Sequence, residues 1–460
     1  MCLALGRGLP ERFKQNDSQG VELQEDTIIG DELGPIIRAA LNHRCGKSLD
    51  EIEYRKYFKL YFEYGCLCLK RLWEECGEDQ SIFISKLLKE AMLFEYNEGD
   101  TETINTKSIV NDPVSLKILK NEDPWIINSS GGNGLIVISG KPGRGKSQLA
   151  LDLLAQAARQ GVRFLFFDLK GELEENEDNK QQIENRQNFL NSTGARYTRL
   201  ITSGLPINPL FKTDNDTVNA QISSEFASLV RSFAPQLSAS QERTIRNAFD
   251  NIDNPDFINL AEELETQGET GEGYSIIEKI ARFKIFSASE KAISIEEWLS
   301  NSQIIDFKPL GNDKETKALA VAFILNTIMK QLAQSLPIVN GIQPLQMILF
   351  VDEAHLLLPK EGKSGLLGSL ARQGRAWGFP VWLASQDADA FLTTGDNATD
   401  FAELADCGVH FSPQVLSEKQ QRSILGQIFS KLLNKGEAVL RLHEKSKSGE
   451  VYQFYQNHGR

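Results

Sequence analysis

The chain has 460 residues, of which 41% are hydrophobic and 25% charged, the composition of an ordinary globular protein. Its net charge of −13 argues against a surface that is basic throughout, although a basic pore behind acidic outer faces is compatible with this sum. No run approaches the roughly 18 apolar residues of a membrane-spanning helix, and the N-terminus lacks the charged start of a signal peptide, so we expect a cytoplasmic protein.

The first part of the chain is predicted to be helical. Apolar residues recur at spacings of three and four between residues 32 and 94, and a polar stretch follows. We therefore predict a small all-α domain at residues 1–96, a linker at 97–124 and a further domain at 125–460. Cys66-Leu67-Cys68 lacks the paired C-x-x-C spacing of a zinc knuckle, so we interpret these cysteines as buried thiols.

From residue 125 onward, short apolar segments alternate with amphipathic helices, which is typical of a parallel α/β sheet. The predicted strands are LIVIS (135–139), VRFLFFDL (162–169), QIIDFKPL (303–310), MILFVDE (347–353), PVWLASQ (380–386) and EAVLRL (437–442). Four are nearly continuous apolar runs, as expected for strands covered on both faces. Residues 213–300 indicate a helical insertion, and the acidic run at 171–187 a solvated helix or loop.

A glycine-rich loop follows the first of these strands and opens a helix, which is the context of a nucleotide-binding P-loop. Glycines let backbone N–H groups converge on phosphate oxygens, and the helix N-terminus adds partial positive charge. Lys146 is placed to contact the β- and γ-phosphates of ATP, and Ser147 to bind Mg²⁺. The predicted nucleotide-binding residues are Gly140, Lys141, Pro142, Gly143, Arg144, Gly145, Lys146, Ser147 and Gln148.

A second acidic element lies at the end of the strand MILFV. Asp352 and Glu353 emerge at the carboxyl edge of the sheet, where ligands bind in open α/β folds. We expect Asp352 to hold the water shell of Mg²⁺ and Glu353 to act as the general base. Taken alone, this pair is also compatible with an ordinary acidic strand end. A glutamate beside the magnesium aspartate favours hydrolysis over phosphate transfer to a small molecule.

Gln386 ends a further apolar strand. If that strand lies between the two motif strands, Gln386 faces the γ-phosphate and can sense it; otherwise it is a solvent-facing strand end.

Several segments, in this order, resemble the HerA/FtsK superfamily of hexameric DNA-translocating ATPases, and HerA most of all. They are Asp168-Leu169-Lys170-Gly171-Glu172 (a D-x-K-G-E segment), Asn208-Pro209-Leu210, VDEAH, LARQGRAWGFPVWLASQ, FAELADCGVHF and GEAVLRL. The resemblance covers residues 130 to 445. It implies a RecA-like domain in a hexameric ring whose ATP sites lie between subunits, with double-stranded DNA as partner. Arg375, and after it Arg372, are the candidates for an arginine at the γ-phosphate, in cis or in trans.

The N-terminal part departs from this family, because HerA proteins usually begin with a small β-barrel. The stretch from Gly20 to Glu32, with the helix after it, faintly resembles DndE of DNA phosphorothioation systems, a small helical protein associated with nicked DNA. This resemblance implies a DNA-binding module fused to a HerA-like motor that acts in DNA modification or defence. Otherwise residues 1–94 are a docking domain for a nuclease or another partner.

We therefore predict a magnesium-dependent ATPase that moves or remodels double-stranded DNA alongside a nuclease or DNA-modifying partner. Two alternatives stay open. One is a conjugation- or secretion-type coupling ATPase of the same superfamily, and the other is a nucleotide-dependent scaffold that positions an effector.

Overall fold

The computed structural model describes residues 109–174, 180–234, 236–357, 366–386, 388–392, 400–430, 432–442 and 445–453. The all-α domain predicted at residues 1–96, with its DndE-like segment, lies outside these residues. Among those that are described, no helix combines the length and apolar character needed to cross a membrane.

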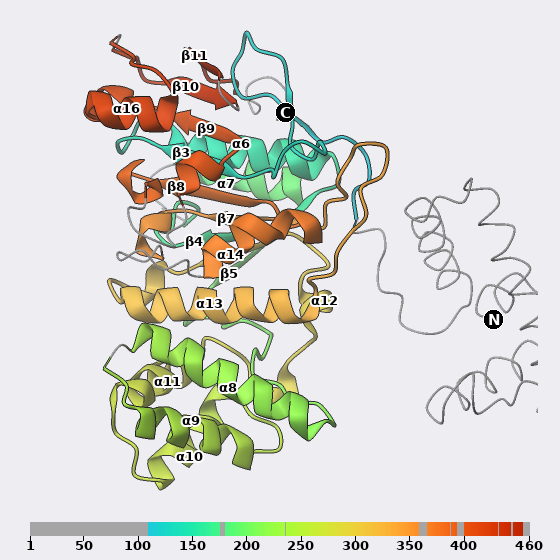
Figure 1. Cartoon of the computed structure of the whole chain (residues 1–460), viewed down its shortest axis with the longest axis vertical. Helices are drawn as coiled ribbons and strands as arrows, with labels where there is room; N and C mark the ends of the chain where they lie inside the picture. The colour runs from blue at the N-terminus through green and yellow to red at the C-terminus, as the bar shows by residue number, and fades with distance from the viewer. Residues whose placement is uncertain are drawn as a thin grey trace, which may run out of the picture. The chain divides into compact units, whose positions relative to one another are not determined.

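A nine-stranded sheet organises the fold, in the order β11-β10-β9-β3-β8-β7-β4-β6-β5 (Figure 1). Every neighbouring pair from β9 to β5 is parallel, whereas β10 and β11 extend the sheet in antiparallel fashion. The strands are β3 (Ile136–Ser139), β4 (Arg163–Asp168), β5 (Arg196–Arg199), β6 (Gln303–Asp306), β7 (Met347–Val351), β8 (Val381–Ser385), β9 (Cys407–His410), β10 (Glu437–Leu442) and β11 (Lys445–Glu450).

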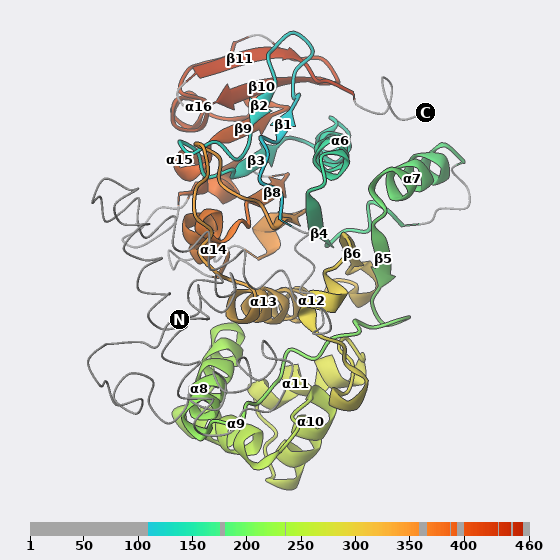
Figure 2. The same ribbon diagram turned by 90° about the vertical axis from the view of Figure 1, so that its right-hand side faces the viewer.

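Helices cover both faces of this sheet. Helices α6 and α7 lie on one face, and α13 and α14 contribute to the core on the other (Figure 2). The α-helices are α6 (Lys146–Arg159), α7 (Lys180–Thr193), α8 (Asp216–Phe233), α9 (Ala239–Asn251), α10 (Phe257–Thr266), α11 (Glu272–Arg282), α12 (Ile295–Trp298), α13 (Lys314–Gln331), α14 (Leu366–Gln373), α15 (Phe401–Leu404) and α16 (Glu418–Leu425).

The alternation of side chains along a strand accounts for the continuous apolar runs. Ile136 and Ile138 enter the core beneath α6, whereas Leu135 and Val137 enter the opposite core. Because both faces are buried, neither set of positions can be polar. The predicted α/β class is confirmed, and all six predicted strands are present.

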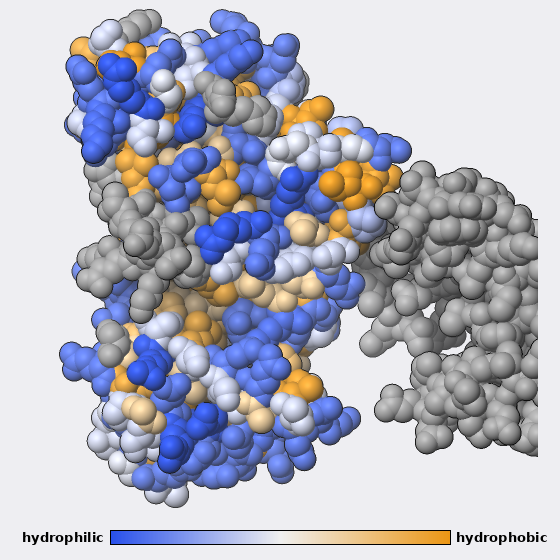
Figure 3. Space-filling view, viewed as in Figure 1, coloured by the Kyte–Doolittle hydropathy of each residue, from blue (hydrophilic) through white to orange (hydrophobic). Residues whose placement is uncertain are grey.

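The predicted helical insertion is also present, as α8 to α12. Four of these five helices, all but α11, begin at side-chain caps, and the caps Ser238 and Asp256 both form capping boxes. Its interior is aromatic, and Phe226 stacks on Phe323 of α13 with ring centroids 5.5 Å apart. The outer surface over these helices is mostly hydrophilic (Figure 3), consistent with apolar faces that turn inward.

Several parts of the domain are absent from the predicted elements. The predicted domain start at residue 125 is too late, because Val114 and Leu116 are completely buried and β1 (Ser115–Leu116) pairs with β2 (Trp125–Ile126). The other parts are β5 and β11, which are polar edge strands, and β9, which is only four residues long. Short or polar strands give little hydrophobic periodicity, so the sequence does not reveal them.

Candidate active site

The loop from Gly140 to Ser147 joins β3 to α6 at the carboxyl edge of the sheet. All three of its glycines have positive φ, and the values at Gly140 (153°) and Gly145 (117°) lie in the region that side chains rarely adopt. A Cβ on Gly140 would also lie 2.7 Å from the Cβ of Phe411. The chain therefore follows a tight path over Phe411, as a loop that presents backbone N–H groups to an anion requires.

Strand β9 and the residues after it contact the strand end that precedes this loop. His410 Nδ1 lies 2.7 Å from the hydroxyl of Ser139, and the N–H of Phe411 donates to the carbonyl of Ser139 at 2.8 Å. Burial, with a smaller effect of Arg441, lowers the pKa of His410 to about 3, so its imidazole is neutral. The FAELADCGVHF segment thus supplies a support for the phosphate loop, a role that its sequence alone did not indicate.

Asp352 and Glu353 follow β7 at the same edge and are almost completely buried, with 2% and 5% exposure. Neither carboxylate oxygen of Asp352 has a hydrogen-bond partner within the described part of the chain. Burial, followed by the charges of Asp168, Glu353 and Glu172, raises the pKa of Asp352 to about 8. Glu353 adopts φ 51° and ψ 44°, a left-handed conformation uncommon for residues other than glycine.

Strand β8 lies between β3 and β7, which is the condition set for the sensor hypothesis of Gln386. Its Nε2 donates to Oε1 of Glu353 at 2.5 Å. Two residues with no role assigned from sequence also contact this glutamate: Lys170 Nζ lies 3.7 Å from Oε1, and His355 Nδ1 lies 3.2 Å from Oε2. The available signal was the D-x-K-G-E segment for Lys170 and the VDEAH segment for His355.

Lys146 shares an electrostatic environment with these carboxylates. Its side chain is buried, and burial lowers its pKa, while Glu353 and Asp352 oppose that shift. The structure therefore brings together four of the predicted residues, Lys146, Asp352, Glu353 and Gln386. Gln148 instead points along its own helix and donates to Oδ1 of Asp152 at 3.3 Å.

The two candidate arginines lie elsewhere. Arg375 belongs to the 3-10 turn η5 (Gly374–Trp377), which precedes β8, and it donates to the carbonyl of Ser130, which precedes β3. Both positions are at the amino edge of the sheet, opposite the phosphate loop. Arg372 precedes Arg375 by three residues and is exposed on the last turn of α14. Arg375 therefore lies away from the phosphate loop of its own chain, and the sequence did not show at which edge its turn lies. A role in trans stays a prediction.

The site fits a magnesium–nucleotide complex. A buried carboxylate whose two oxygens lack donors is costly unless a cation or another ligand satisfies it. Among the described residues, no group of three or more His, Cys, Asp or Glu side chains could hold a metal ion by itself. Mg²⁺ commonly takes only one or two protein ligands and completes its shell with phosphate oxygens and water. Ser147 and Asp352 are the side chains that would hold it.

Comparisons with known proteins identify the fold. No protein-family model and no curated protein matches the sequence. The solved structure of VirB4 of Thermoanaerobacter pseudethanolicus matches with a TM-score of 0.51 and 15% identity, over 75% of this chain and 98% of that chain. This is a RecA-like P-loop NTPase fold, as predicted. At this identity the similarity shows the fold alone.

Looser structural matches include two further proteins. The bacterial conjugative coupling protein TrwBdeltaN70 matches with a TM-score of 0.40 and 15% identity, over 75% of this chain and 89% of that chain. The genome packaging NTPase B204 of Sulfolobus turreted icosahedral virus 2 matches with a TM-score of 0.30 and 10% identity, over 69% of this chain and 97% of that chain.

Proposed function

We propose that the chain is a magnesium-dependent ATPase that hydrolyses ATP to ADP and phosphate. The observation that carries this proposal is the buried pair Asp352 and Glu353 beside a complete phosphate loop: among the described residues, both oxygens of Asp352 and Oε2 of Glu353 lack a donor. The fold shared with VirB4 supports this proposal, because a glycine-rich loop between a strand and a helix suits nucleotide binding.

Each residue has a distinct task in this proposal. The loop N–H groups and Lys146 bind the phosphates, and Ser147 with Asp352 holds Mg²⁺, which supplies positive charge to the phosphate oxygens. Glu353 takes a proton from the attacking water. Gln386 contacts this base and senses the γ-phosphate. Glu353 is nearly buried, so few solvent molecules compete with the attacking water for its carboxylate.

We further propose that the protein is a cytoplasmic, ring-forming motor, a hexamer, that translocates double-stranded DNA together with a nuclease or a DNA-modification or defence partner. Its support is the order of the HerA/FtsK-like segments along residues 130 to 445. Arg375 or Arg372 would complete the ATP site of a neighbouring subunit. The DndE-like stretch from Gly20 to Glu32 would bind DNA in a phosphorothioation system.

A second candidate function is a coupling ATPase of the conjugation or secretion type. The observation that favours it is the fold shared with VirB4, whose solved chain is matched over 98% of its length. A nucleotide-dependent scaffold with negligible turnover is a third function class, and it predicts assembly with ATP but little hydrolysis.

The test is steady-state ATP hydrolysis by the full chain, with and without linear double-stranded DNA. We expect Glu353→Gln to bind ATP and to lose at least about 100-fold in kcat, because it keeps the size of the side chain but not the base. Lys146→Ala should lose ATP binding. Stimulation of wild-type turnover by DNA favours the motor, whereas DNA-independent turnover favours the coupling ATPase. Robust hydrolysis by Glu353→Gln would remove the proposed base.

A further inference from the structure

The carboxylate of Glu353 is held by one oxygen more firmly than by the other. Its Oε1 accepts the hydrogen bond from Gln386 and faces the ammonium group of Lys170. Its Oε2 is buried and accepts no hydrogen bond within the described residues, although His355 Nδ1 lies 3.2 Å away. The hydrogen bond and the ammonium contact that hold this carboxylate are therefore both made through Oε1.

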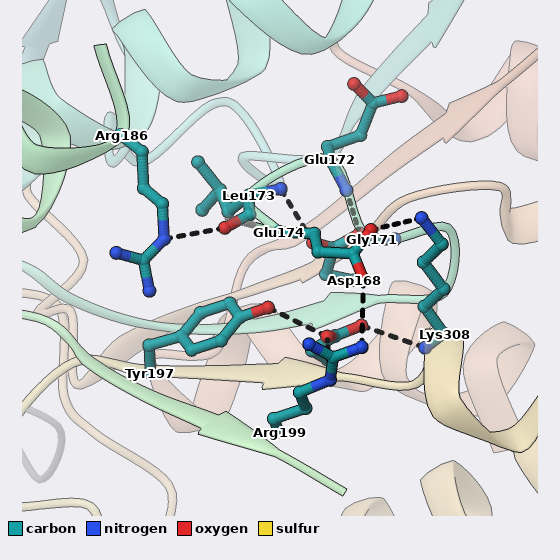
Figure 4. A network of polar contacts seen from close by, with 10 residues as sticks. Asp168, Gly171, Glu172, Leu173, Glu174, Arg186, Tyr197, Arg199 and Lys308 are labelled. Atoms are coloured by element: carbon teal, nitrogen blue, oxygen red, sulfur yellow. Dashed lines mark hydrogen bonds and ion pairs between the residues drawn. The ribbon is translucent and has the colours of Figure 1, made fainter. Parts of the chain in front are cut away.

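The loop that presents Lys170 is fixed by Asp168 at the end of β4. The carboxylate of Asp168 accepts three backbone N–H groups, from Gly171, Glu172 and Leu173, at 2.7, 3.0 and 3.2 Å (Figure 4). On the other side of Lys170, the carbonyl of Leu169 accepts from the buried Lys317 at 2.9 Å. The backbone at residue 170 is therefore held from both sides.

Further along the loop, Glu174 ties it to the neighbouring strands. Its carboxylate pairs with Arg199 at 2.9 Å and with Lys308 (Figure 4). The backbone N–H of Lys308 in turn donates to Asp306 at 2.8 Å. These contacts connect the loop to β5 and β6, so the position of Lys170 is set by the sheet and not by its own side chain.

Exposed ion pairs usually contribute little, and the Lys170 side chain is 47% exposed. Its partner is different, because the Glu353 side chain is only 6% exposed. A charge buried at one end of a pair interacts more strongly than two solvated charges. Lys170 also lies 3.4 Å from Glu172, which keeps its ammonium group beside the site.

We propose that Lys170 is a positioning residue for hydrolysis: together with Gln386 it anchors Oε1 of Glu353 and so fixes the carboxylate that accepts the proton of the attacking water. This role rests on the proposed ATPase function. Without the ammonium group the carboxylate can rotate about its terminal bonds, and the water loses its fixed acceptor. The contact is to the proposed base, so we expect its loss to affect the chemical step more than nucleotide binding.

The test compares kcat and KM for ATP in the full chain carrying Lys170→Met, which keeps the apolar stem, and Lys170→Arg, which keeps the charge. We expect Lys170→Met to lower kcat about 10-fold with KM changed less than about two-fold, and Lys170→Arg to recover most of the loss. Lys120→Met is the matched control, because Lys120 is a similarly exposed lysine paired with Glu450 at the far edge of the sheet. It should leave both constants unchanged.

A second comparison separates positioning from a structural effect. In a Glu353→Gln background, adding Lys170→Met should not lower single-turnover hydrolysis further, because the lysine acts through the glutamate. If Lys170→Met unfolds early, Lys170→Gln serves for the same measurements. A wild-type kcat in the Met and Gln variants, or a loss that appears only in KM, would overturn the role of Lys170 alone. A wild-type chain that binds ATP without turnover would overturn the ATPase proposal together with it.

Discussion

Two pairs of buried carboxylates at the same sheet edge have opposite surroundings. Asp168 and Asp306 end β4 and β6, and both are completely buried among donors. Asp306 accepts from Tyr197 and from the N–H of Lys308, each at 2.8 Å. The pair after β7, in contrast, has three oxygens without a hydrogen bond in the described residues. Satisfied carboxylates of this kind hold the fold together, whereas unsatisfied ones mark where a ligand binds.

The electrostatic cost differs between the pairs as well. Burial raises the pKa of Asp168 to about 6, and its backbone hydrogen bonds oppose that rise. Burial and three neighbouring carboxylates raise the pKa of Asp352 to about 8. Asp352 therefore destabilises the ligand-free chain in its charged form, a cost that a bound cation would offset.

The largest effect is expected at the satisfied pair. Asp168→Ala removes the acceptor of three backbone N–H groups in a fully buried position. We expect the free energy of unfolding to fall by about 3 kcal/mol, because stranded buried donors are costly. Urea denaturation of the full chain measures this. A loss below about 0.5 kcal/mol would remove the distinction between the two pairs.

A smaller effect of opposite sign is expected at Asp352. Asp352→Asn replaces a buried carboxylate, unpartnered among the described residues, by a neutral amide. The free energy of unfolding of the nucleotide-free protein should therefore rise by about 1 kcal/mol. The same substitution at Asp168 is the matched control and should destabilise. Thermal unfolding with and without Mg²⁺ and ATP provides the measurement, and the ligands should stabilise the wild type far more than Asp352→Asn. A destabilised Asp352→Asn would contradict the comparison.

The smallest effect is expected at Lys308, an exposed lysine next to the satisfied pair Asp168 and Asp306. Lys308→Ala removes an ion pair with Glu174 but keeps the backbone N–H that donates to Asp306. Because the lysine side chain is 50% exposed, we expect a loss of at most about 1 kcal/mol. Urea denaturation beside Asp168→Ala tests the ranking. A loss equal to that of Asp168→Ala would mean that the exposed ion pair of Lys308, and not the buried carboxylate of Asp168, holds the loop.

The sequence predicted those parts of the site that are local in the chain. The phosphate loop, Asp352 and Glu353 follow from motifs beside apolar strands, and β8 between β3 and β7 agrees with the condition set for Gln386. Contacts between distant segments were not predictable in this way. Lys170 and Glu353 are 183 positions apart in sequence, and their contact depends on β4 and β7 being neighbours. Strand order is set by tertiary packing, which local periodicity does not report.

The same limit explains why the position of Arg375 in the fold was not predicted from the sequence. Helix α14 and η5 lead back toward the start of β8, which places Arg375 against Ser130 at the amino edge. The spacing of arginines along the chain contains no information about that direction. The start of the domain is a second case, since β1 and β2 have two residues each and are too short for a period to be recognised.

The shared core of the sheet and the insertion has a mechanical consequence. Buried residues of the strands, of α13 and of α8 to α11 form one contiguous cluster. Close-packed interiors deform little, so we expect this cluster to connect the sheet and the helical layer rigidly. A small tilt of the strands would therefore move the helical layer with them as one rigid body. The displacement of the helices would be largest at the end farthest from the sheet.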